Sequence, residues 1–400
     1  MKKGWENRKI GEVIDHLRTG LNPRTHFKLN TPDADGYYIT VRELKGFAIE
    51  PDEKTDKVNN AAIKRINERS NLRIGDVLFS GTGTIGKTAL VSVLPTNWNI
   101  KEGVYAMTPK HSILDSKYFI YYIGSGFFLR LVNEKAAGTG VRSIPMKELV
   151  KLPISVPPIS EQQAIVNYLD SAFAKIDAMK ANAEKALDEA KALFQASLKE
   201  MLEPKEGWEK KKIDEVCAIA RGGSPRPIKE FITNDPKGLN WIKIGDTDMG
   251  GKYIYSTKEK IKPEGLKRSR WVEEDDFLLS NSMSFGRPYI LKTNGCIHDG
   301  WLVLRDYQKY LNIDFFYYVL SSENVQRQFR TKAQGSTVSN LNTDRVASVI
   351  IYIPPLKEQQ SIVATLDSIK SKVDHLQENY NKISQECDTL KQAILRQVFE

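Results

Sequence analysis

Cysteine is scarce in this sequence, and its pattern points neither to disulfides nor to a metal site. The 400 residues include only Cys217, Cys296 and Cys387, with no C-x-x-C spacing. An odd number of widely separated thiols argues against a disulfide framework and against a cysteine zinc site. We therefore expect a reducing compartment, the cytoplasm, and no metal site in this chain.

Long apolar runs are also missing. No stretch reaches the roughly 18 apolar residues that a transmembrane helix needs. The opening residues, Met1–Glu6, contain no apolar core of a secretory signal. The sequence therefore predicts no membrane contact and no export.

The sequence holds one stretch that looks catalytic, and its context argues against catalysis. Residues Gly81–Thr88 fit the phosphate-binding pattern G-x-x-x-x-G-K-T, and Phe79–Gly83 fit an F-x-G-x-G pattern of methyltransferases. A phosphate-binding loop must lead into a helix whose amino terminus faces the phosphate. Residues Ala89–Leu94 instead read as a strand and are followed by Pro95. We interpret the stretch as a tight turn at Gly86 with a cation beside it.

Two other stretches lack the neighbours that chemistry requires. Pro51–Lys54 resembles a fragment of a nuclease motif, but its acidic residues are adjacent, so we interpret it as a solvated turn. The pair His298–Asp299 has no third ligand or nucleophile nearby in the sequence, which favours a structural role. We therefore predict no catalytic residue and no metal ligand in this chain.

Positive charge is concentrated outside two acidic segments. The net charge is +9, whereas residues 160–203 carry a net −3 and residues 357–400 a net −1. The rest of the chain is therefore strongly basic. Such a surface indicates a polyanionic partner, most often nucleic acid, with a merely basic protein as the alternative.

The chain is a tandem repeat. Gly4-Trp5-Glu6 returns as Gly207-Trp208-Glu209. The stretch Val156–Val166, with the pattern P-P-x-x-E-Q-Q-x-I-V, returns as Ile353–Val363. Because these landmarks recur in the same order, every motif must be considered twice.

Each repeat begins with a globular part of mixed α/β character. Landmarks occur in the same order in both repeats: turns at Gly20–Arg24 and Gly222–Arg226, strands at Tyr38–Val41 and Trp241–Ile244, strands at Asp76–Ser80 and Asp276–Ser280, buried helices at Phe119–Tyr122 and Phe315–Tyr318, and polar loops at Gly138–Ser143 and Gly335–Asn340.

Each repeat ends in a long helix. The prolines stop the preceding strand, and Ser160 with Gln163 fits a capping box. Apolar residues then alternate steps of four and three, which predicts a helix-pair seam. The seam residues are Ile165, Leu169, Ile176, Met179 and Leu193 in the first helix, and Ile362, Leu366, Ile369, Val373, Leu376, Leu390 and Ile394 in the second. The alternative is a pair of ordinary amphipathic helices.

These features divide the chain into four segments. We expect a globular domain over residues 1–158, a long helix over 159–203, a second globular domain over 204–355 and a second long helix over 356–400.

The duplicated G-W-E starts and P-P-x-x-E-Q-Q helix entries resemble the specificity subunit of type I restriction–modification systems, over essentially the whole chain. The resemblance implies an α/β (α+β) fold: two mixed target recognition domains separated by two long antiparallel coiled-coil helices in a pseudo-two-fold arrangement. It also implies that each domain reads half of a split, asymmetric site in double-stranded DNA. The helices are then expected to act as a spacer and as the dock for partner subunits.

The resemblance places all catalysis on those partners. They are two modification subunits, which methylate adenine with S-adenosylmethionine, and restriction subunits, which translocate DNA with ATP and Mg²⁺ and cleave it. The chain itself is then expected to bind no cofactor.

Loop residues are the candidates for DNA contact, because phosphates and base edges are bound by basic and polar side chains. In the first repeat they are Asn22, Arg24, Arg42, Thr82, Thr84, Lys87 and Arg142. In the second they are Ser224, Arg226, Lys243, Ser282, Ser284, Arg287, Ser339 and Asn340.

Two alternatives remain open. One is a standalone adenine methyltransferase or nuclease with duplicated DNA-reading domains, which requires a cofactor or metal site. The other is a basic coiled-coil scaffold. Binding of S-adenosylmethionine by the isolated chain would favour the enzyme, and the absence of any preferred duplex would favour the scaffold.

Overall fold

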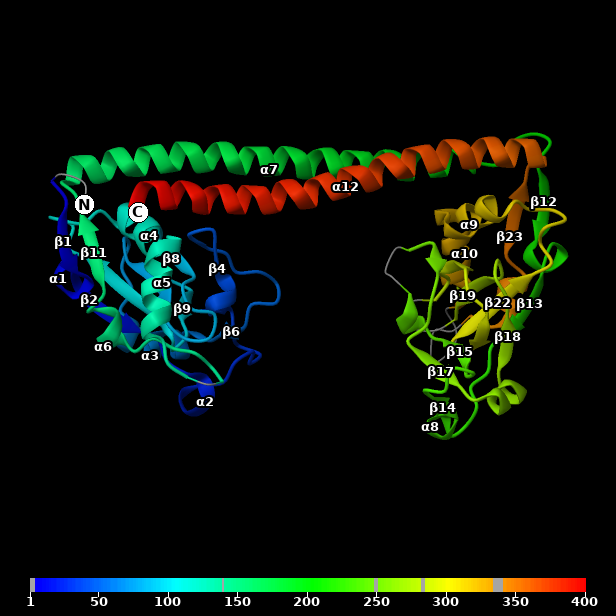
Figure 1. Cartoon of the computed structure of the whole chain (residues 1–400), viewed down its shortest axis with the longest axis horizontal. Coiled ribbons are helices and arrows are strands. Elements are labelled where there is room, and N and C mark those ends of the chain that lie inside the picture. The colour runs from blue at the N-terminus through cyan, green and yellow to red at the C-terminus, as the bar shows by residue number, and fades with distance from the viewer. Residues whose placement is uncertain (1–3, 139, 248–250, 282–284, 334–340) are drawn as a thin grey trace. The chain divides into compact units, whose positions relative to one another are not determined.

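The computed structural model describes residues 4–138, 140–247, 251–281, 285–333 and 341–400. The chain forms two compact units (Figure 1). Unit 1 consists of Met1–Ala183 and Tyr380–Glu400, and unit 2 of Glu184–Asn379. Each unit therefore combines one globular repeat with part of both long helices. Within the described residues, no helix is both long enough and apolar enough to cross a membrane.

Unit 1 is built on a four-stranded sheet in the order β2-β10-β7-β8, in which every pair is antiparallel. A small sheet, β6-β3-β9, and the pairs β1-β11 and β4-β5 complete it. The strands are β1 (Glu6–Lys9), β2 (Ile14–Thr19), β3 (Gly36–Ile39), β4 (Leu44–Lys45), β5 (Ala48–Ile49), β6 (Lys57–Val58), β7 (Val77–Ser80), β8 (Thr88–Leu90), β9 (Trp98–Ile100), β10 (Val104–Pro109) and β11 (Pro153–Val156). The helices are α1 (Ile10–Val13), α2 (Pro23–His26), α3 (Asn60–Ser70), α4 (Ser116–Ile123), α5 (Gly126–Lys135) and α6 (Met146–Leu149).

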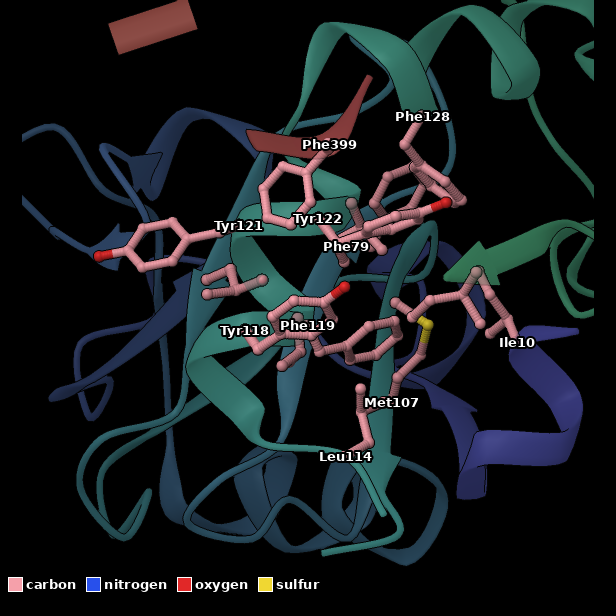
Figure 2. Packing of buried hydrophobic residues seen from close by; sticks show 14 of the residues in the cluster. Ile10, Phe79, Met107, Leu114, Tyr118, Phe119, Tyr121, Tyr122, Phe128 and Phe399 are labelled. Atoms are coloured by element: carbon pink, nitrogen blue, oxygen red, sulfur yellow. The ribbon is translucent and has the colours of Figure 1, made fainter. Parts of the chain in front are cut away.

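The two faces of this sheet bury different cores, because successive side chains of a strand point to opposite sides. Phe79 packs with the helices α4 and α5, whereas Leu78 packs with β3 and β9. Figure 2 shows the helical core, where Phe399 lies beside Tyr122 with ring centroids 5.3 Å apart. The end of the second long helix is thus part of the core of the first globular repeat.

Unit 2 has the same architecture as unit 1, but its two main sheets contain more strands. One sheet has the order β13-β22-β19-β20-β16, a second has β14-β17-β15-β21-β18, and β12 pairs with β23. The strands are β12 (Glu209–Lys212), β13 (Ala218–Arg221), β14 (Ile232–Thr233), β15 (Leu239–Ile242), β16 (Tyr253–Ile254), β17 (Glu259–Ile261), β18 (Arg270–Val272), β19 (Phe277–Ser280), β20 (Pro288–Leu291), β21 (Gly295–Ile297), β22 (Trp301–Arg305) and β23 (Ile350–Ile353). The helices are α8 (Ile228–Phe231), α9 (Ile313–Ser321), α10 (Glu323–Ala333) and α11 (Thr343–Ala347).

The long helices are α7 (Ile159–Met201) and α12 (Leu356–Phe399). In each unit a segment of α7 lies against a segment of α12, green and orange to red in Figure 1. Asp177 forms an ion pair with Lys391 at 2.5 Å in unit 1, and Lys191 donates to Gln377 at 2.8 Å in unit 2. Within unit 1, Lys391 lies over the Phe173 ring and the Cys387 thiol approaches the Ile176 carbonyl. The partner number falls as the α7 number rises, so the segments are antiparallel, as the resemblance implies.

The buried glutamine of the E-Q-Q motif fastens each helix to its globular repeat. Gln162 is fully buried; its Oε1 accepts from the Asp115 backbone N–H, and its Nε2 donates to the carbonyls of Ile113 and Pro157, each at 2.8 Å. Gln359 makes the same three bonds in unit 2, to Asn312, Tyr310 and Pro354. The predicted capping box at Ser160 is wrong, because the helix already begins at Ile159.

The G-W-E motif meets the same helix entry. The Trp5 indole N–H donates to Glu161 at 2.8 Å, and Trp208 donates to Glu358 at 3.3 Å. The two sequence signatures of each repeat therefore meet in one contact, between the residue that precedes the first strand and the start of the long helix.

A Gln162→Leu variant should destabilise unit 1 by about 3 kcal/mol, because it leaves one buried N–H and two carbonyls without their bonds. The neighbouring Gln163 is exposed, so Gln163→Leu should change stability by less than about 0.5 kcal/mol. Thermal unfolding of both variants checks this expectation. Equal losses would contradict a role specific to the buried glutamine.

A second repeated contact corrects the sequence alignment of α4 and α9. The Tyr121 hydroxyl donates to Asp170 at 2.5 Å in unit 1, and Tyr318 donates to Asp367 in unit 2. The equivalence of Phe119–Tyr122 with Phe315–Tyr318, inferred from the sequence, pairs Tyr121 with Tyr317 instead, one residue away. The hydrogen bond to the long helix fixes the register, which similarity between two aromatic stretches does not.

Some residues that were predicted to lie in the seam between the long helices lie outside it. Leu169, Ile176, Ile362, Leu366 and Val373 are buried, and Ile165, Ile369, Leu376 and Ile394 are half-buried. Met179, Leu193 and Leu390, however, are 57%, 60% and 47% exposed. In α7 the buried face instead contains Phe173 and Leu187. Alternate seam positions therefore lie one residue later than predicted, where the larger apolar side chains bury more surface.

Candidate nucleic-acid interface

In unit 1 four loops that are distant in the sequence meet beside the main sheet. Leu21 bridges to Lys101, the Gly81 N–H donates to the Gly103 carbonyl at 2.8 Å, and the Gly83 N–H donates to the Arg142 carbonyl at 2.9 Å. These backbone bonds hold the loops around residues 20–24, 81–84, 101–103 and 141–144 together.

The first of these loops needs glycine. A Cβ atom on Gly20 would lie 1.7 Å from the Ile100 carbonyl oxygen, and one on Gly222 would lie 2.2 Å from the His298 carbonyl oxygen. The same close approach therefore occurs in both units, which explains why this turn is shared by the repeats.

The loops present most of the candidate residues of the first repeat. Arg24, Thr82, Thr84 and Arg142 are exposed. Asn22 is half-buried, and its side chain accepts from the Arg24 N–H at 3.1 Å, which caps α2. The structure therefore brings these five candidates into one cluster of connected loops.

Arg42 and Lys87 lie apart from that cluster. Arg42 is near Asp56, at 3.7 Å, and near Glu43, at 3.6 Å, so its charge is shared with two carboxylates. Lys87 directly precedes β8, at the base of the hairpin turn, and lines a cavity together with Gly46 and Leu129.

The G-x-x-x-x-G-K-T stretch is the turn of a β-hairpin. Strands β7 and β8 are antiparallel, and the Gly86 N–H donates to the Ser80 carbonyl at 3.0 Å. As predicted, a strand follows this turn, so the turn does not lead into a helix as a phosphate-binding loop must. In unit 2 the Gly286 N–H donates to the Ser280 carbonyl at 2.7 Å, so the same turn is made without the motif.

Unit 2 assembles equivalent loops. The Gly223 N–H donates to the Ile297 carbonyl at 3.1 Å, the Asn281 N–H to the Gly300 carbonyl at 3.0 Å, and the Leu341 N–H to the Asn281 carbonyl at 3.0 Å. The candidates Ser282, Ser284, Ser339 and Asn340 lie outside the described residues.

Asp299 organises the described candidates of this second cluster. It accepts from the Ser224 hydroxyl at 2.5 Å and lies 3.5 Å from Arg226. The hydrogen bond from Ser224 is the main reason that the pKa of Asp299 lies below its usual range. Lys243 is paired with Glu259 at 2.6 Å, and Arg287 is exposed at the base of the hairpin.

Sequence reasoning missed three arginines at this cluster. Arg221 donates to the Asp299 carbonyl, Arg270 donates to the Arg221 carbonyl, and Arg268 donates to the Arg226 carbonyl. All three are exposed. Arg221 directly precedes the Gly222–Arg226 turn, so the sequence did hold a signal for it. It holds none for Arg268 and Arg270, because their segment reaches this loop only through the tertiary fold.

His298 is structural, as predicted. The Gly300 N–H faces its Nδ1 at 2.7 Å and the Ile244 N–H faces its Nε2 at 3.2 Å, while the ring packs between Trp241 and Trp301. A charged imidazolium would therefore direct its protons at two donors. Burial lowers the pKa of His298, whereas nearby Asp299 opposes that shift.

We expect unit 2 to lose stability as the pH falls below about 6.5, the ordinary histidine value. The unfolded chain takes up a proton there, while the folded His298, with its lowered pKa, resists it. A His298→Gln variant should flatten this part of the stability profile. Thermal unfolding between about pH 5 and pH 8 measures the difference, and an unchanged slope would contradict the assignment.

The sequence matches a known family twice. A family model for the type I restriction modification DNA specificity domain matches residues 2–188 and again residues 205–385. The putative type I restriction enzyme MjaX specificity subunit of Methanocaldococcus jannaschii is 24% identical over 411 residues, which cover 98% of this chain and 92% of that protein. The StySPI specificity subunit of Salmonella potsdam is 22% identical, with 100% and 89% coverage.

Solved structures share the fold. A chain from a study of complex assembly and conformational transition in a type I R-M system has a TM-score of 0.74 at 21% identity, covering 100% of this chain and 98% of that one. The HsdS subunit of Thermoanaerobacter tengcongensis has a TM-score of 0.55 at 20% identity, covering 100% and 97%. The chain belongs to the family of type I restriction–modification DNA specificity subunits, and it carries two copies of the family's domain in tandem.

Proposed function

We propose that each unit of this non-catalytic specificity subunit reads one half of a bipartite, asymmetric site in double-stranded DNA. The observation that carries this proposal is the pair of loop clusters. Both clusters are held by equivalent backbone hydrogen bonds at Gly81 and Asn281, yet they present different side chains. Two loop clusters with the same backbone arrangement but different side chains are suited to reading two different DNA sequences, because side chains in the grooves distinguish the bases.

The partners in this proposal are two modification subunits and the restriction subunits that translocate DNA. S-adenosylmethionine, ATP and Mg²⁺ would bind to those partners, and the complex would work in the cytoplasm. The exposed apolar residues on the long helices, among them Tyr168, Met179 and Leu193, support a role for α7 in subunit docking. The structure offers no support for a standalone methyltransferase or nuclease, because the one loop with a cofactor-like pattern is a hairpin turn.

The test is an exchange of residues 1–150 for the same region of a relative that has a different specificity. Mapping of methylated adenines in cells that carry the complete system should show one half-site changed and the other unchanged. The matched control exchanges residues 204–350 and should change the other half-site alone. A change in both half-sites from either exchange would refute the division of reading between the units.

A further inference from the structure

Unit 1 contains a cavity of about 510 Å³ between its hairpin turn and its long helix. Its walls come from the β4–β5 turn, the β7–β8 turn, the α4–α5 junction and α12. They include Gly46, Phe47, Lys87, Gly124, Leu129 and Leu395.

Unit 2 contains the same site as two adjoining cavities of about 860 and 470 Å³. Their walls include Gly251, Lys252, Arg287, Ser321, Gln326 and Leu198. These positions correspond one by one to the six of unit 1. The backbone matches Phe47 with Lys252: the Leu90 N–H donates to the Phe47 carbonyl at 3.0 Å, and the Ile290 N–H donates to the Lys252 carbonyl at 2.9 Å.

Glycine brings the hairpin turn into the wall in both units. Gly86 and Gly286 have φ angles of 95° and 80°, in the left-handed region that favours glycine. A Cβ on Gly86 would lie 2.3 Å from Leu129 of α5, and one on Gly286 would lie 3.0 Å from Phe329 of α10. This close approach fixes the next residue, Lys87 or Arg287, at the edge of the cavity.

Most other cations of these walls are neutralised. Lys45 lies 3.6 Å from Asp52, Lys391 lies 2.5 Å from Asp177, and Lys252 lies 2.6 Å from Asp314. Lys370 is paired with Asp374. By contrast, neither Lys87 nor Arg287 has an ion-pair partner among the residues that the structure describes, and both side chains are exposed. Each unit therefore places a cation without an ion-pair partner at the same position. In unit 1 the carboxylate of Asp388 also lines the cavity, beyond ion-pair distance of Lys87.

We propose that each cavity accepts a carboxylate carried on an apolar segment of one modification subunit. This inference rests on the proposed function, in which two such subunits bind the chain. A site that is repeated while the reading loops differ must meet the same group in both units. Lys87 and Arg287 share a positive charge but not the forked geometry of arginine, so a single carboxylate is a group that both can bind.

The walls favour a protein segment over a DNA phosphate. Phe47, Leu129 and Leu395 line the cavity in unit 1, and Leu198, Tyr289 and Tyr317 line the cavities in unit 2. Such surfaces gain from burying apolar side chains, whereas a phosphate of the DNA backbone remains hydrated at the surface.

The experiment measures assembly of the full chain with its modification subunits by native mass spectrometry at limiting concentration. Lys87→Glu and Arg287→Glu should each weaken the binding of one modification subunit by roughly 30-fold, because a charge pair becomes a like-charge contact. Each single variant should therefore form mainly a complex with one modification subunit, and the double variant should form neither contact. Lys87→Arg and Arg287→Lys are the matched controls and should assemble as the native chain does.

Salt-dependent binding of the assembled complex to its DNA provides the second readout. Unchanged assembly of both charge-reversal variants would overturn the proposal. Unchanged assembly combined with a salt slope reduced by about 1 per variant would instead assign the cations to DNA phosphates. A different result would contradict the proposed function: a complex of the unsubstituted chain with two modification subunits that binds no DNA duplex in preference to others.

Discussion

An Ile176→Asp variant should lose about 4 kcal/mol of stability in unit 1, because it places an unpaired charge in an apolar core. Ile176 is 4% exposed and packs in the cluster that contains Leu169, Phe173 and Cys387. The Cys387 thiol approaches the Ile176 carbonyl at 3.7 Å, so the partner helix covers this site directly. The unfolding temperature should fall by about 10 °C, as measured by calorimetry.

Met179→Asp is the matched control, three residues further along the same helix. The sequence pattern assigns Met179 to the same seam, whereas the structure leaves it 57% exposed. Its replacement should therefore change stability by less than about 0.5 kcal/mol. A large loss at Met179 with little effect at Ile176 would show that the observed helix phase is wrong.

Arg18→Ala should be similarly damaging, with a loss of about 3–5 kcal/mol, because it leaves a buried carboxylate without its countercharge. Asp76 is fully buried, and Arg18 Nη2 lies 2.9 Å from its Oδ2. Burial lowers the pKa of Arg18, and the Asp76 carboxylate opposes that shift. Thr108 and the Arg73 N–H also donate to Asp76, but neither supplies a charge.

Unit 2 shows how the loss can be repaired. Its equivalent carboxylate, Asp276, is bound by Arg305 with Nε 2.9 Å from both oxygens. By strand register, Arg305 occupies the position of Thr108, and Ala220 occupies the position of Arg18. The double variant Arg18→Ala/Thr108→Arg should therefore recover most of the stability that Arg18→Ala loses. If unfolding experiments show the double variant to be no more stable than the single one, the two arrangements are not interchangeable.

The sequence by itself determined the repeat, the mixed α/β character of both globular parts and the two long helices, whereas their antiparallel packing was implied by the family resemblance. These features depend on local periodicity and on motifs that occur twice, so a single chain acts as its own comparison. The rejection of a phosphate-binding loop also followed from the local sequence, because the residues directly after the motif's lysine form a strand that begins at Thr88. The family resemblance rested on the helix entries, where Gln162 and Gln359 make the same bonds.

Only the tertiary structure decided which alternate residues of α7 are buried, because the apolar pattern permits two phases and the packing of Phe173 selects one. It also decided that Arg24, Thr82 and Arg142 belong to one loop cluster, whereas Lys87 lines a cavity near α12. The arginines that bind the equivalent carboxylates Asp76 and Asp276 are Arg18 and Arg305, respectively. They occupy non-equivalent strands of the two units, and no sequence pattern relates them. In each case the deciding contacts join residues far apart in the sequence, and their free energy exists only once the sheets and helices have packed.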